Sequence, residues 1–317
     1  MSALVVAGAM VLDAVTGDPR SLYDRIPHPV TLMARRLTEL ETWLNRPEDT
    51  DRRRRTMGVI ALAVYVSAWT LGGLLVTRFL DGQLGTLLTI ALASTLLAGR
   101  DLFDHVGAVA KALAGTEDTT AAREAVGRIV GRETASLDRP AIARAAIESL
   151  AENLSDGFVA PVFWFAVAGF PGLVAYKAIN TADSLIGHRS ERYRAFGWAA
   201  ARLDDLANWI PARITAALLC AAALKEGRTG EAWTTARRDA ALHLSPNAGW
   251  PEAAMAGALG IRLGGPRRYG TEQVDGAWFG TGRAEADAAD LSRALQIARR
   301  VWIGLILAAL AVAFIFD

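Results

Sequence analysis

Long apolar runs separated by charged blocks constrain this chain more than any other feature of its sequence. Residues 57–80, MGVIALAVYVSAWTLGGLLVTRFL, supply the roughly 20 apolar positions that a helix needs to cross a bilayer. Residues 84–99 form a second run, and the two together predict a transmembrane hairpin. Three further apolar segments follow at 157–176, 209–224 and 301–316. The pattern predicts an all-α, polytopic membrane protein with about four to five transmembrane or re-entrant helices and helical cytoplasmic segments.

The apolar runs divide the chain into six segments. We predict an N-terminal apolar segment with a polar loop (1–56), a transmembrane hairpin (57–99), a cytoplasmic helical segment (100–156), a membrane-associated core with two apolar segments (157–224), a second cytoplasmic segment (225–300) and a C-terminal transmembrane helix (301–317). The second of these cytoplasmic segments includes the loop SPNAGWPEA, and a helix is expected to begin at Asp138-Arg139-Pro140.

The orientation follows from basic residues beside the spans. Arginines at 52–55 precede one long run and Arg299 and Arg300 precede the last, and cytoplasmic ends of spans are enriched in Lys and Arg. We therefore expect a multi-pass protein of the cell (inner) membrane, with the segments 100–156 and 225–300 in the cytoplasm. The segment 157–176 either crosses fully or turns back at Gly169-Phe170-Pro171-Gly172, and the sequence leaves both possibilities open.

The net charge and the motifs in the sequence exclude some classes of function. The formal net charge is +1, which gives no strong field favouring nucleic acid, so no nucleic-acid partner is expected. The sequence contains no P-loop, no CxxC and no HExxH motif. If the protein uses ATP, it therefore does not use a Walker motif.

Acidic and amide side chains gather just before the third apolar run. Glu148, Glu152 and Asp156 are four residues apart, so a continuing helix would place them on one face, where like charges repel. For Glu148 we expect a solvated face, helped by an ion pair with Arg144. Glu152, Asn153 and Asp156 adjoin an apolar segment, where an uncompensated charge is costly, and for these we predict functional roles.

A second polar block begins directly after the third apolar run. On a helix Lys177, Asn180, Thr181 and Ser184 share a face, with Asp183 at its edge. A lysine at this depth can serve as an anchor that reaches the membrane interface. Four further polar residues beside it predict a binding site instead.

A third block holds paired aspartates and an asparagine between two arginines. Asp204, Asp205 and Asn208 offer the hard oxygen ligands that suit magnesium. Arg202 and Arg213 offer guanidinium forks for phosphate or carboxylate. An ordinary helix surface with an Arg202–Asp205 ion pair explains the pattern equally well, and the residues alone leave both interpretations open.

Two turn-rich segments add weaker candidates. His28 lies in the sequence HPV, after GDP at 17–19, and a lone histidine is more often structural than a ligand. Asn247 lies in the loop 245–252, SPNAGWPE, whose composition suits a segment that closes over a ligand.

Together these blocks resemble the adenosylcobinamide-phosphate synthase family of cobalamin biosynthesis, the CobD/CbiB family, whose members are membrane-bound. The central match is long and ungapped, and mild departures at Ala34, Ala182 and Leu185 leave the polar positions intact. The matching stretches are Asp13 with GDP at 17–19, HPV at 28–30, AENLSDGFVAP at 151–161, YKAINTADSLIGHRSERYRAFGWAAARLDDLANWIPAR at 176–213, SPNAGWPEAAMAGALG at 245–260 and LGGPRRYG at 263–270.

The resemblance implies a carbon–nitrogen ligase. Such an enzyme joins adenosylcobyric acid to aminopropanol, or to its O-phosphate, through an amide bond, with ATP as co-substrate. Because a carboxylate oxygen is a poor leaving group, phosphorylation would first give an acyl phosphate that the amine attacks. This chemistry needs Mg²⁺ and cationic groups around the phosphoryl group, and a base that keeps the amine neutral. Membrane lipid and a second copy of the chain, or other membrane enzymes of the corrinoid pathway, are the further partners expected.

The resemblance also implies roles for the polar side chains of the matched blocks. We expect catalytic roles for Glu152, Lys177, Asp183 and Asp205. The candidate magnesium ligands are Asp156, Asp183, Asp204 and Asp205. Substrate and phosphate binding is expected of His28, Asn153, Asn180, Ser184, Arg202, Asn208, Arg213 and Asn247.

Other functions fit parts of the same sequence. An intramembrane, magnesium-dependent prenyl-type transferase also places aspartate-rich segments at helix ends, and it would turn over lipid diphosphates. A non-enzymatic corrinoid-binding scaffold would bind cobyric acid without forming product. A transporter ranks last, because the spans show no paired halves.

The first test replaces two of the carboxylates. Asp183→Asn and Glu152→Gln each remove a charge while keeping the side chain's shape, so we expect amide formation to fall by about 100-fold or more, as for loss of a general acid or base. Product is measured by mass spectrometry. Normal turnover by both folded variants would reject these two assignments.

Overall fold

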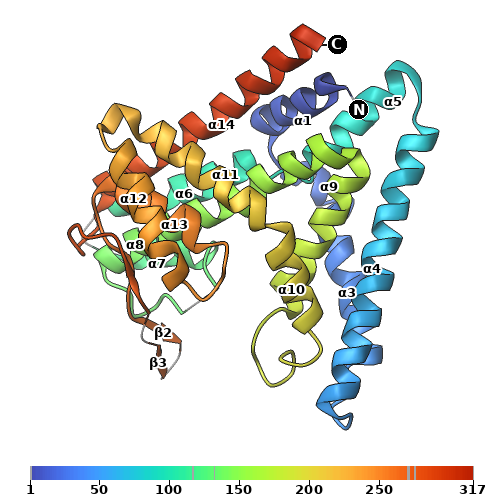
Figure 1. Ribbon diagram of the computed structural model, residues 1–317, viewed down its shortest axis with the longest axis horizontal. Coiled ribbons are helices and arrows are strands. Elements are labelled where there is room, and N and C mark those ends of the chain that lie inside the picture. Colours follow the sequence, from blue (N-terminus) through green and yellow to red (C-terminus); the bar gives the residue numbers. More distant parts are fainter. Residues whose placement is uncertain (1, 116–117, 132, 270–271, 275, 317) are drawn as a thin grey trace. The chain divides into compact units, whose positions relative to one another are not determined.

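The structure, a computed structural model, is built almost entirely of helices (Figure 1). It describes residues 2–115, 118–131, 133–269, 272–274 and 276–316. The chain forms two compact units. Unit 1 comprises Met1–Ala98, Ala160–Asn208 and Ala308–Asp317, and unit 2 comprises Gly99–Val159 and Trp209–Leu307.

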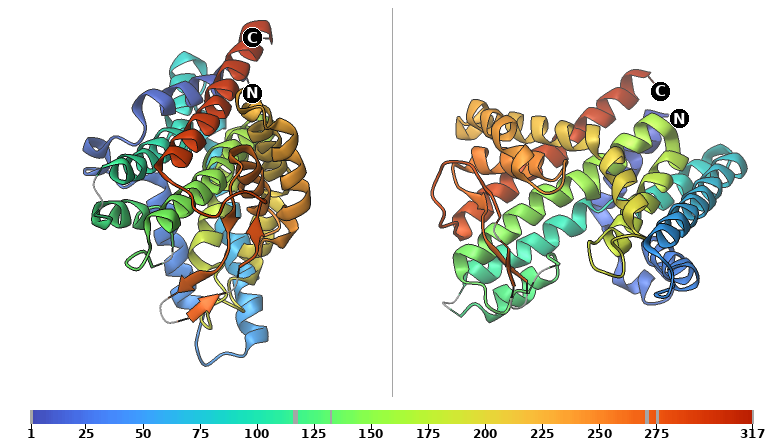
Figure 2. Two further views of the ribbon diagram at one scale, coloured as in Figure 1. Left: turned by 90° about the vertical axis from the view of Figure 1, so that its left-hand side faces the viewer. Right: turned by 60° about the horizontal axis from the view of Figure 1, so that its bottom comes forward.

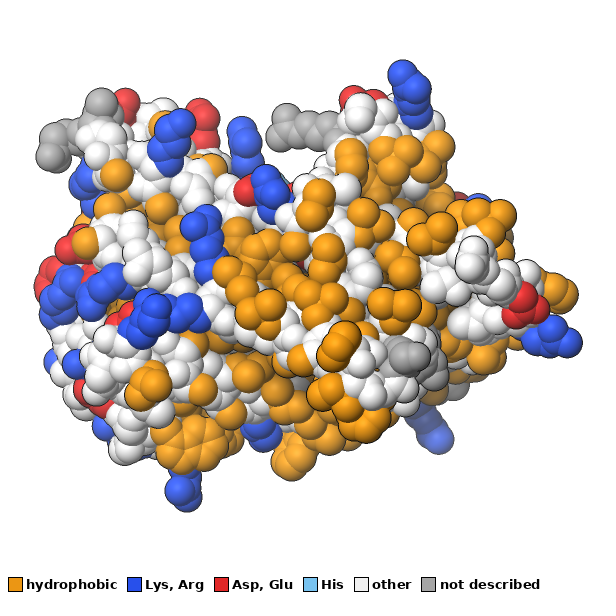
Figure 3. All heavy atoms as spheres, turned by 90° about the horizontal axis from the view of Figure 1, so that it is seen from above, with side chains coloured by type: hydrophobic (Ala, Val, Ile, Leu, Met, Phe, Trp, Pro, Cys, Tyr) orange, Lys and Arg blue, Asp and Glu red, His pale blue; other side chains and the backbone are white. Residues whose placement is uncertain are grey.

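Several helical segments are suited to a membrane. By length and composition, four are long and apolar enough to cross one: Asp51–Phe79, Gly82–Ala114, Arg139–Ile186 and Ala288–Phe316. A bent pair, Trp198–Ala207 with Trp209–Glu226, adds a fifth if its two parts, which meet at 46°, form one span. Much of the surface drawn in Figure 3 is apolar, as expected of helices that face lipid. The predicted all-α, polytopic architecture is confirmed.

Unit 1 is organised around a long, broken helix, α9 (Ala160–Ile186). This helix packs against α3, α4 and α10, while α1 packs against α5. The other helices of the unit are α1 (Ala3–Thr16), α2 (Arg20–Tyr23), α3 (Pro29–Leu44), α4 (Asp51–Phe79), α5 (Gly82–Ser94) and α10 (Trp198–Ala207).

The break in α9 lies at the glycine–proline stretch where the sequence allows a turn. Gly169 has φ 69° and ψ −168°, a conformation that suits glycine because it has no Cβ. Pro171 follows, and its ring cannot donate a backbone hydrogen bond to the preceding turn. The ribbon changes direction at this point and continues as helix to Ile186 (Figure 1). The helix is therefore interrupted within Gly169–Gly172, the stretch at which the sequence allows the chain to turn back.

Unit 2 is a set of short helices with two small sheets. Helices α12 and α13 pack closely, α11 lies against both, and α8 contacts α6 and α13. Its helical elements are α6 (Gly99–Ala114), α7 (Thr120–Gly127), α8 (Arg139–Leu154), the π-helical turn η1 (Ser155–Val159), α11 (Trp209–Ala222), the 3₁₀ turns η2 (Ala223–Glu226) and η3 (Ala240–Leu242), α12 (Thr229–Asp239) and α13 (Gly249–Leu259).

The strands of unit 2 lie within the LGGPRRYG region and just after it. Strand β1 (Leu263–Gly264) pairs with β4 (Trp278–Phe279), and β2 (Arg267–Tyr269) pairs with β3 (Glu272–Val274), both antiparallel. Gly270, the last residue of that sequence stretch, lies outside the described residues. Helix α14 (Ala288–Phe316) follows and is continuous over its 29 residues (Figure 2).

Local signals at α8 give one confirmed prediction and one error. The side chain of Asp138 accepts a hydrogen bond from the N–H of Ala141 at 2.8 Å, with Pro140 in the first turn, so the predicted helix start is confirmed. The solvated face expected for Glu148 was wrong. Its carboxylate is buried and accepts a hydrogen bond from the N–H of Gly264 at 2.7 Å. Arg144 donates instead to the carbonyl of Ala284 at 2.8 Å.

Close packing of α12 on α13 depends on a glycine and is open to test. A Cβ at Gly257 would lie 2.7 Å from the Cα of Ala232, so Gly257→Ala forces the helices apart. We expect it to lower the free energy of unfolding by about 1–3 kcal/mol, the usual cost of overpacking. Thermal unfolding of the purified protein in detergent measures the effect.

Gly230 in α12 provides the matched control, since nothing lies within 4 Å of the position that its Cβ would take. Gly230→Ala should leave the unfolding temperature unchanged or raise it slightly. Equal destabilisation by both substitutions would contradict the packing argument.

Candidate functional site

Polar side chains from α9 and α10 meet inside unit 1 around the carboxylate of Asp204. We call this group the Asp204 cluster; its members are Tyr176, Asn180, Asp183, Asp204 and Asn208. Asp204 is 8% exposed, and Tyr176 and Asn208 are almost fully buried. A carboxylate in such surroundings requires donors within the protein, because burial of an unpaired charge is costly.

Two asparagines supply those donors. The side-chain NH₂ of Asn208 donates to Oδ2 of Asp204 at 2.9 Å, and that of Asn180 donates to Oδ1 at 3.3 Å. The hydroxyl of Tyr176 donates to Oδ1 of Asn208 at 2.9 Å. Because this bond occupies the carbonyl oxygen, the NH₂ of Asn208 must face Asp204. Tyr176 therefore fixes the orientation of the amide that holds the carboxylate.

Helical spacing explains why these residues meet. Asp204 and Asn208 are four residues apart at the end of α10, and Tyr176, Asn180 and Asp183 lie on successive turns of α9. The indole N–H of Trp164 donates to the carbonyl of Ala207 at 3.1 Å and ties the end of α10 to the first part of α9.

Further negative charge surrounds Asp204. The carboxylates of Asp183 and Asp205 are both close enough to repel it electrostatically. Gly187 makes room for Asp183, because a Cβ at that position would lie 2.0 Å from Oδ1 of the aspartate. The negative charge of Asp183 and Asp205 adds to that of Asp204, which favours a cation or a protonated amine nearby.

The other predicted residues of this region have local partners. Arg202 and Asp205 form an ion pair at 3.4 Å, with the arginine side chain 64% exposed, so the surface pair that the sequence left open is present. Ser184 is exposed and donates to the carbonyl of Asn180 at 2.9 Å. Lys177 is buried, and its carbonyl accepts a hydrogen bond from Thr181 at 2.7 Å.

Unit 2 contains a second group, centred on Arg213. The guanidinium lies 4.4 Å from the ring centroid of Trp209 and 4.9 Å from that of Trp250. Its Nη1 donates to Oδ1 of Asn247 at 3.2 Å and to the carbonyl of Trp209 at 2.6 Å. Two predicted binding residues, 34 positions apart, are thus brought together. The stacked indoles hold the guanidinium plane in place.

The acidic stretch at the end of α8 differs from the simplest helical expectation. Helix α8 ends at Leu154 and the turn that follows is π-helical, so the regular four-residue spacing does not continue to Asp156. Glu152 and Asp156 are half-buried. Asn153 is exposed, and its NH₂ donates to the carbonyl of Ser149 at 2.8 Å.

His28 has a structural position. Its Nδ1 accepts a hydrogen bond from the N–H of Val30 at 3.1 Å, which caps the N-terminus of α3. Its Nε2 lies 3.3 Å from Oδ1 of Asp18, and its ring packs edge-on against Tyr23 with centroids 4.5 Å apart. The imidazole thereby joins the GDP and HPV stretches.

The carboxylates of the Asp204 cluster and Asp205 suit one mode of magnesium binding. Within the described residues, no three His, Cys, Asp or Glu side chains come together as a metal centre. Magnesium, however, commonly binds one or two carboxylates together with substrate phosphates and water. One or two of Asp183, Asp204 and Asp205 would suffice for that mode, whereas the residues that the structure describes form no dedicated cage of protein ligands.

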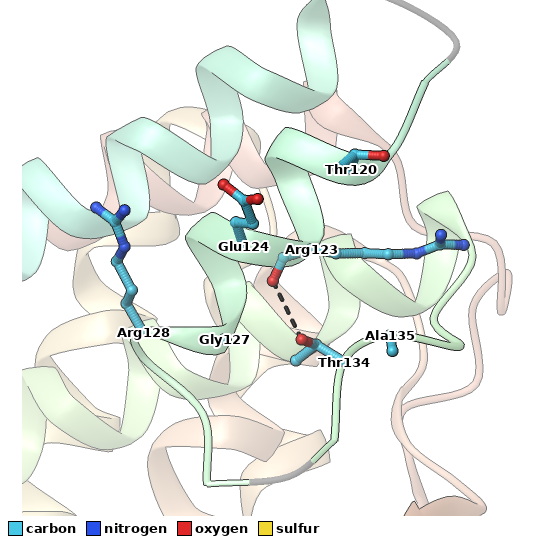
Figure 4. A pocket seen from close by; sticks show the side chains of 7 residues that line it. All are labelled: Thr120, Arg123, Glu124, Gly127, Arg128, Thr134 and Ala135. Carbon is cyan, nitrogen blue, oxygen red and sulfur yellow. Dashed lines mark hydrogen bonds between the residues drawn. The ribbon is translucent and has the colours of Figure 1, made fainter.

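A cavity of about 640 Å³ lies beside α7 in unit 2 (Figure 4). Arg123 and Arg128 point away from each other at its edges, and Thr134 donates to the carbonyl of Arg123 at 3.2 Å. None of the residues that line this cavity belongs to the predicted site.

Sequence reasoning missed Tyr176, Trp209 and Trp250. Each is an aromatic residue within or directly beside a polar block, and that adjacency is the signal that would have identified them. A buried tyrosine or tryptophan needs a partner for its polar atom, or offers a face to a cation.

Comparison with known proteins identifies the family of the chain. The family described as CobD/Cbib protein matches residues 6–298. Cobalamin biosynthesis protein CobD of Rhizobium meliloti (strain 1021) is 48% identical over 301 residues, which cover 93% of this chain and 91% of that protein. Cobalamin biosynthesis protein CobD of Rhodobacter capsulatus is 47% identical over 306 residues, covering 96% and 95%. No solved structure matches. The chain belongs to the CobD/CbiB family of cobalamin biosynthesis proteins.

Proposed function

We propose that this protein joins adenosylcobyric acid to aminopropanol, or to its O-phosphate, through an amide bond, as an ATP- and magnesium-dependent ligase. Membership of the CobD/CbiB family supports a role in cobalamin biosynthesis. The observation that carries the proposed chemistry is the Asp204 cluster, in which a buried carboxylate is oriented by two amide groups and flanked by two further acids.

Asp204 has the properties of a base for the attacking amine. An ionised carboxylate can accept about four hydrogen bonds, and the two amide donors use one position on each oxygen. The negative charge of Asp204 itself attracts a protonated amine to this position. Asp204 would then take the proton, so that the neutral amine presents its lone pair to the activated carboxyl carbon.

The phosphate chemistry would rest on acidic and basic side chains. Asp183 and Asp205 would hold magnesium together with phosphate oxygens, and the metal would neutralise charge on the phosphoryl group. Arg213, stacked on two indoles and bonded to Asn247, keeps the planar fork that suits a phosphate or carboxylate. Lys177 and Glu152 stay candidates for catalytic roles.

The cellular placement is part of the same proposal. ATP and the many amide groups of a corrinoid are water-loving, so the reaction is expected at the cytoplasmic face of the inner membrane. The candidate spans would anchor the enzyme there. A second copy or another membrane enzyme of the pathway is the protein partner proposed.

Reconstitution tests the overall reaction. Purified protein is incubated with adenosylcobyrate, ATP, Mg²⁺ and each amine in turn, and mass spectrometry identifies the amide and the fate of ATP. We expect product with one of the two amines and none when ATP or Mg²⁺ is omitted. Binding of adenosylcobyrate without product would favour the scaffold, and turnover of a lipid diphosphate would favour the prenyl-type transferase.

Substitutions in the Asp204 cluster test its role. We expect Asp204→Asn to lower kcat by about 100-fold or more, because the isosteric amide cannot take a proton. Tyr176→Phe removes only the bond that orients Asn208, so a smaller loss of about two- to tenfold is expected.

Asp104→Asn is the matched control. Asp104 forms an exposed ion pair with Arg100 at 2.9 Å in α6, and such pairs contribute little. Each variant is compared at equal folded fraction, judged by thermal unfolding. Wild-type kcat in folded Asp204→Asn protein would exclude Asp204 as the base.

A further inference from the structure

The segment 187–197 joins the two helices that form the Asp204 cluster. It runs from the end of α9 at Ile186 to the start of α10 at Trp198 and contains no α-helix. Asp183 lies just before this segment and Asp204 lies in the second turn after it. The course of the segment therefore helps to set the distance between the two carboxylates.

Arg192 anchors the middle of this segment to α3. Its Nε and Nη2 donate to Oε1 and Oε2 of Glu41 at 2.9 and 2.7 Å, a bidentate pair across 151 residues of sequence. The carbonyl of the same residue accepts from Nη2 of Arg54 at 2.5 Å and from Nδ2 of Asn45 at 3.1 Å. Both the side chain and the backbone of Arg192 are therefore held.

The receiving residues also hold one another. Asn45 donates to Oε1 of Glu41 at 2.7 Å, and Nε of Arg54 donates to Oδ1 of Asn45 at 2.8 Å. Glu41, Asn45 and Arg54 are all buried. Burial by itself raises the pKa of Glu41, but hydrogen bonds from Arg192 and Asn45 and the charges of Arg192 and Arg54 outweigh it and hold that pKa below its ordinary value. Glu41 is therefore ionised at neutral pH, as the pairing requires.

Two glycines show how tightly the ends of the segment are packed. A Cβ at Gly197 would lie 1.6 Å from the carbonyl oxygen of Ile186, so the end of α9 touches the start of α10. A Cβ at Gly58 of α4 would lie 1.9 Å from the carbonyl oxygen of Phe196. The segment thus has little freedom to shift while Arg192 stays bound.

We infer that Glu41, Asn45, Arg54 and Arg192 form a latch that positions the Asp204 cluster by fixing the segment between its two helices. In this arrangement Glu41 and Arg192 are positioning residues, because they act through the segment on Asp183 and Asp204. The effect of the latch on catalysis rests on the function proposed above. The mechanical coupling, by which the latch fixes the segment and the helix ends beside it, does not.

An ion pair on the same segment provides a matched control. Arg194 lies two residues beyond Arg192 and contacts Asp51 of α4 at 3.1 Å, but both side chains are about two-thirds exposed. Exposed pairs of this kind contribute little, since water competes for both charges. Arg194→Ala therefore removes an arginine from the same segment without touching the latch.

Hydrogen–deuterium exchange tests the mechanical coupling in the purified full-length protein. We expect Arg192→Ala to speed the exchange of amides in 187–197, and of those in 180–186 and 200–205, by about tenfold or more, because two charged hydrogen bonds to a buried acid are lost. Arg192→Lys keeps the charge without the bidentate fork and should give an intermediate effect. Arg194→Ala should match the wild type.

Two further outcomes of the exchange experiment bear on the latch. If Arg192→Ala does not fold, Glu41→Gln, which keeps the shape of the acceptor, takes its place. Exchange in 180–186 and 200–205 that is no faster in the latch variant than in Arg194→Ala would overturn the inference, even if 187–197 itself loosens.

Amide formation by the same samples tests the catalytic consequence. We expect kcat to fall by about tenfold or more in Arg192→Ala, with a change of less than about twofold in KM, and partial recovery in Arg192→Lys. Unchanged kcat in a loosened variant would overturn the positioning role. A wild type that forms no amide would overturn the proposed function alone, and the exchange result would still decide whether the latch exists.

Discussion

Burying a carboxylate is costly unless other groups of the protein donate hydrogen bonds to it, and that constraint shapes the two functional segments described above. Apolar helices offer few partners, so a carboxylate placed among them must bring its own donors. Asp204 is paired with Asn180 and Asn208, and Asn208 in turn with Tyr176. Glu41 also has partners within the protein, Asn45 and Arg192. Each buried acid therefore implies a chain of neighbours whose orientation it fixes.

The two acids are satisfied by different chemistry, and the difference bears on function. Glu41 receives a guanidinium fork, which neutralises its charge and holds it as part of the fold. Among the described residues, the donors to Asp204 are two neutral amides, and Asp183 and Asp205 add negative charge beside it. A carboxylate that is oriented but not neutralised can still take a proton or attract a cation. That contrast is the physical reason for placing the reaction at Asp204 instead of at Glu41.

Much of the architecture follows from the sequence because its signals are local. Apolar runs, the capping residue Asp138 and the glycine at 169 act over a few residues, and the helices and the break in α9 are found where these signals place them. Asn180 and Asp204 lie on different helices, so their pairing depends on how α9 and α10 pack and was not predicted. Glu148 shows where local reasoning fails, because its partner, the N–H of Gly264, is 116 residues away.

The residues of the latch are harder to predict from the sequence than those of the Asp204 cluster. Their partners are distant in the sequence, and their side chains belong to no functional motif. Glu41 of α3 and Asn45, which follows the helix as its C-cap, are four residues apart, a spacing typical of a solvated helix face. They are instead buried, where Arg54 and Arg192 approach from other elements. Gly58 and Gly197 are likewise needed because backbone from another element approaches them closely. Such contacts depend on how the elements pack. The sequence therefore contains the residues of the latch but no local pattern that predicts which of them contact one another.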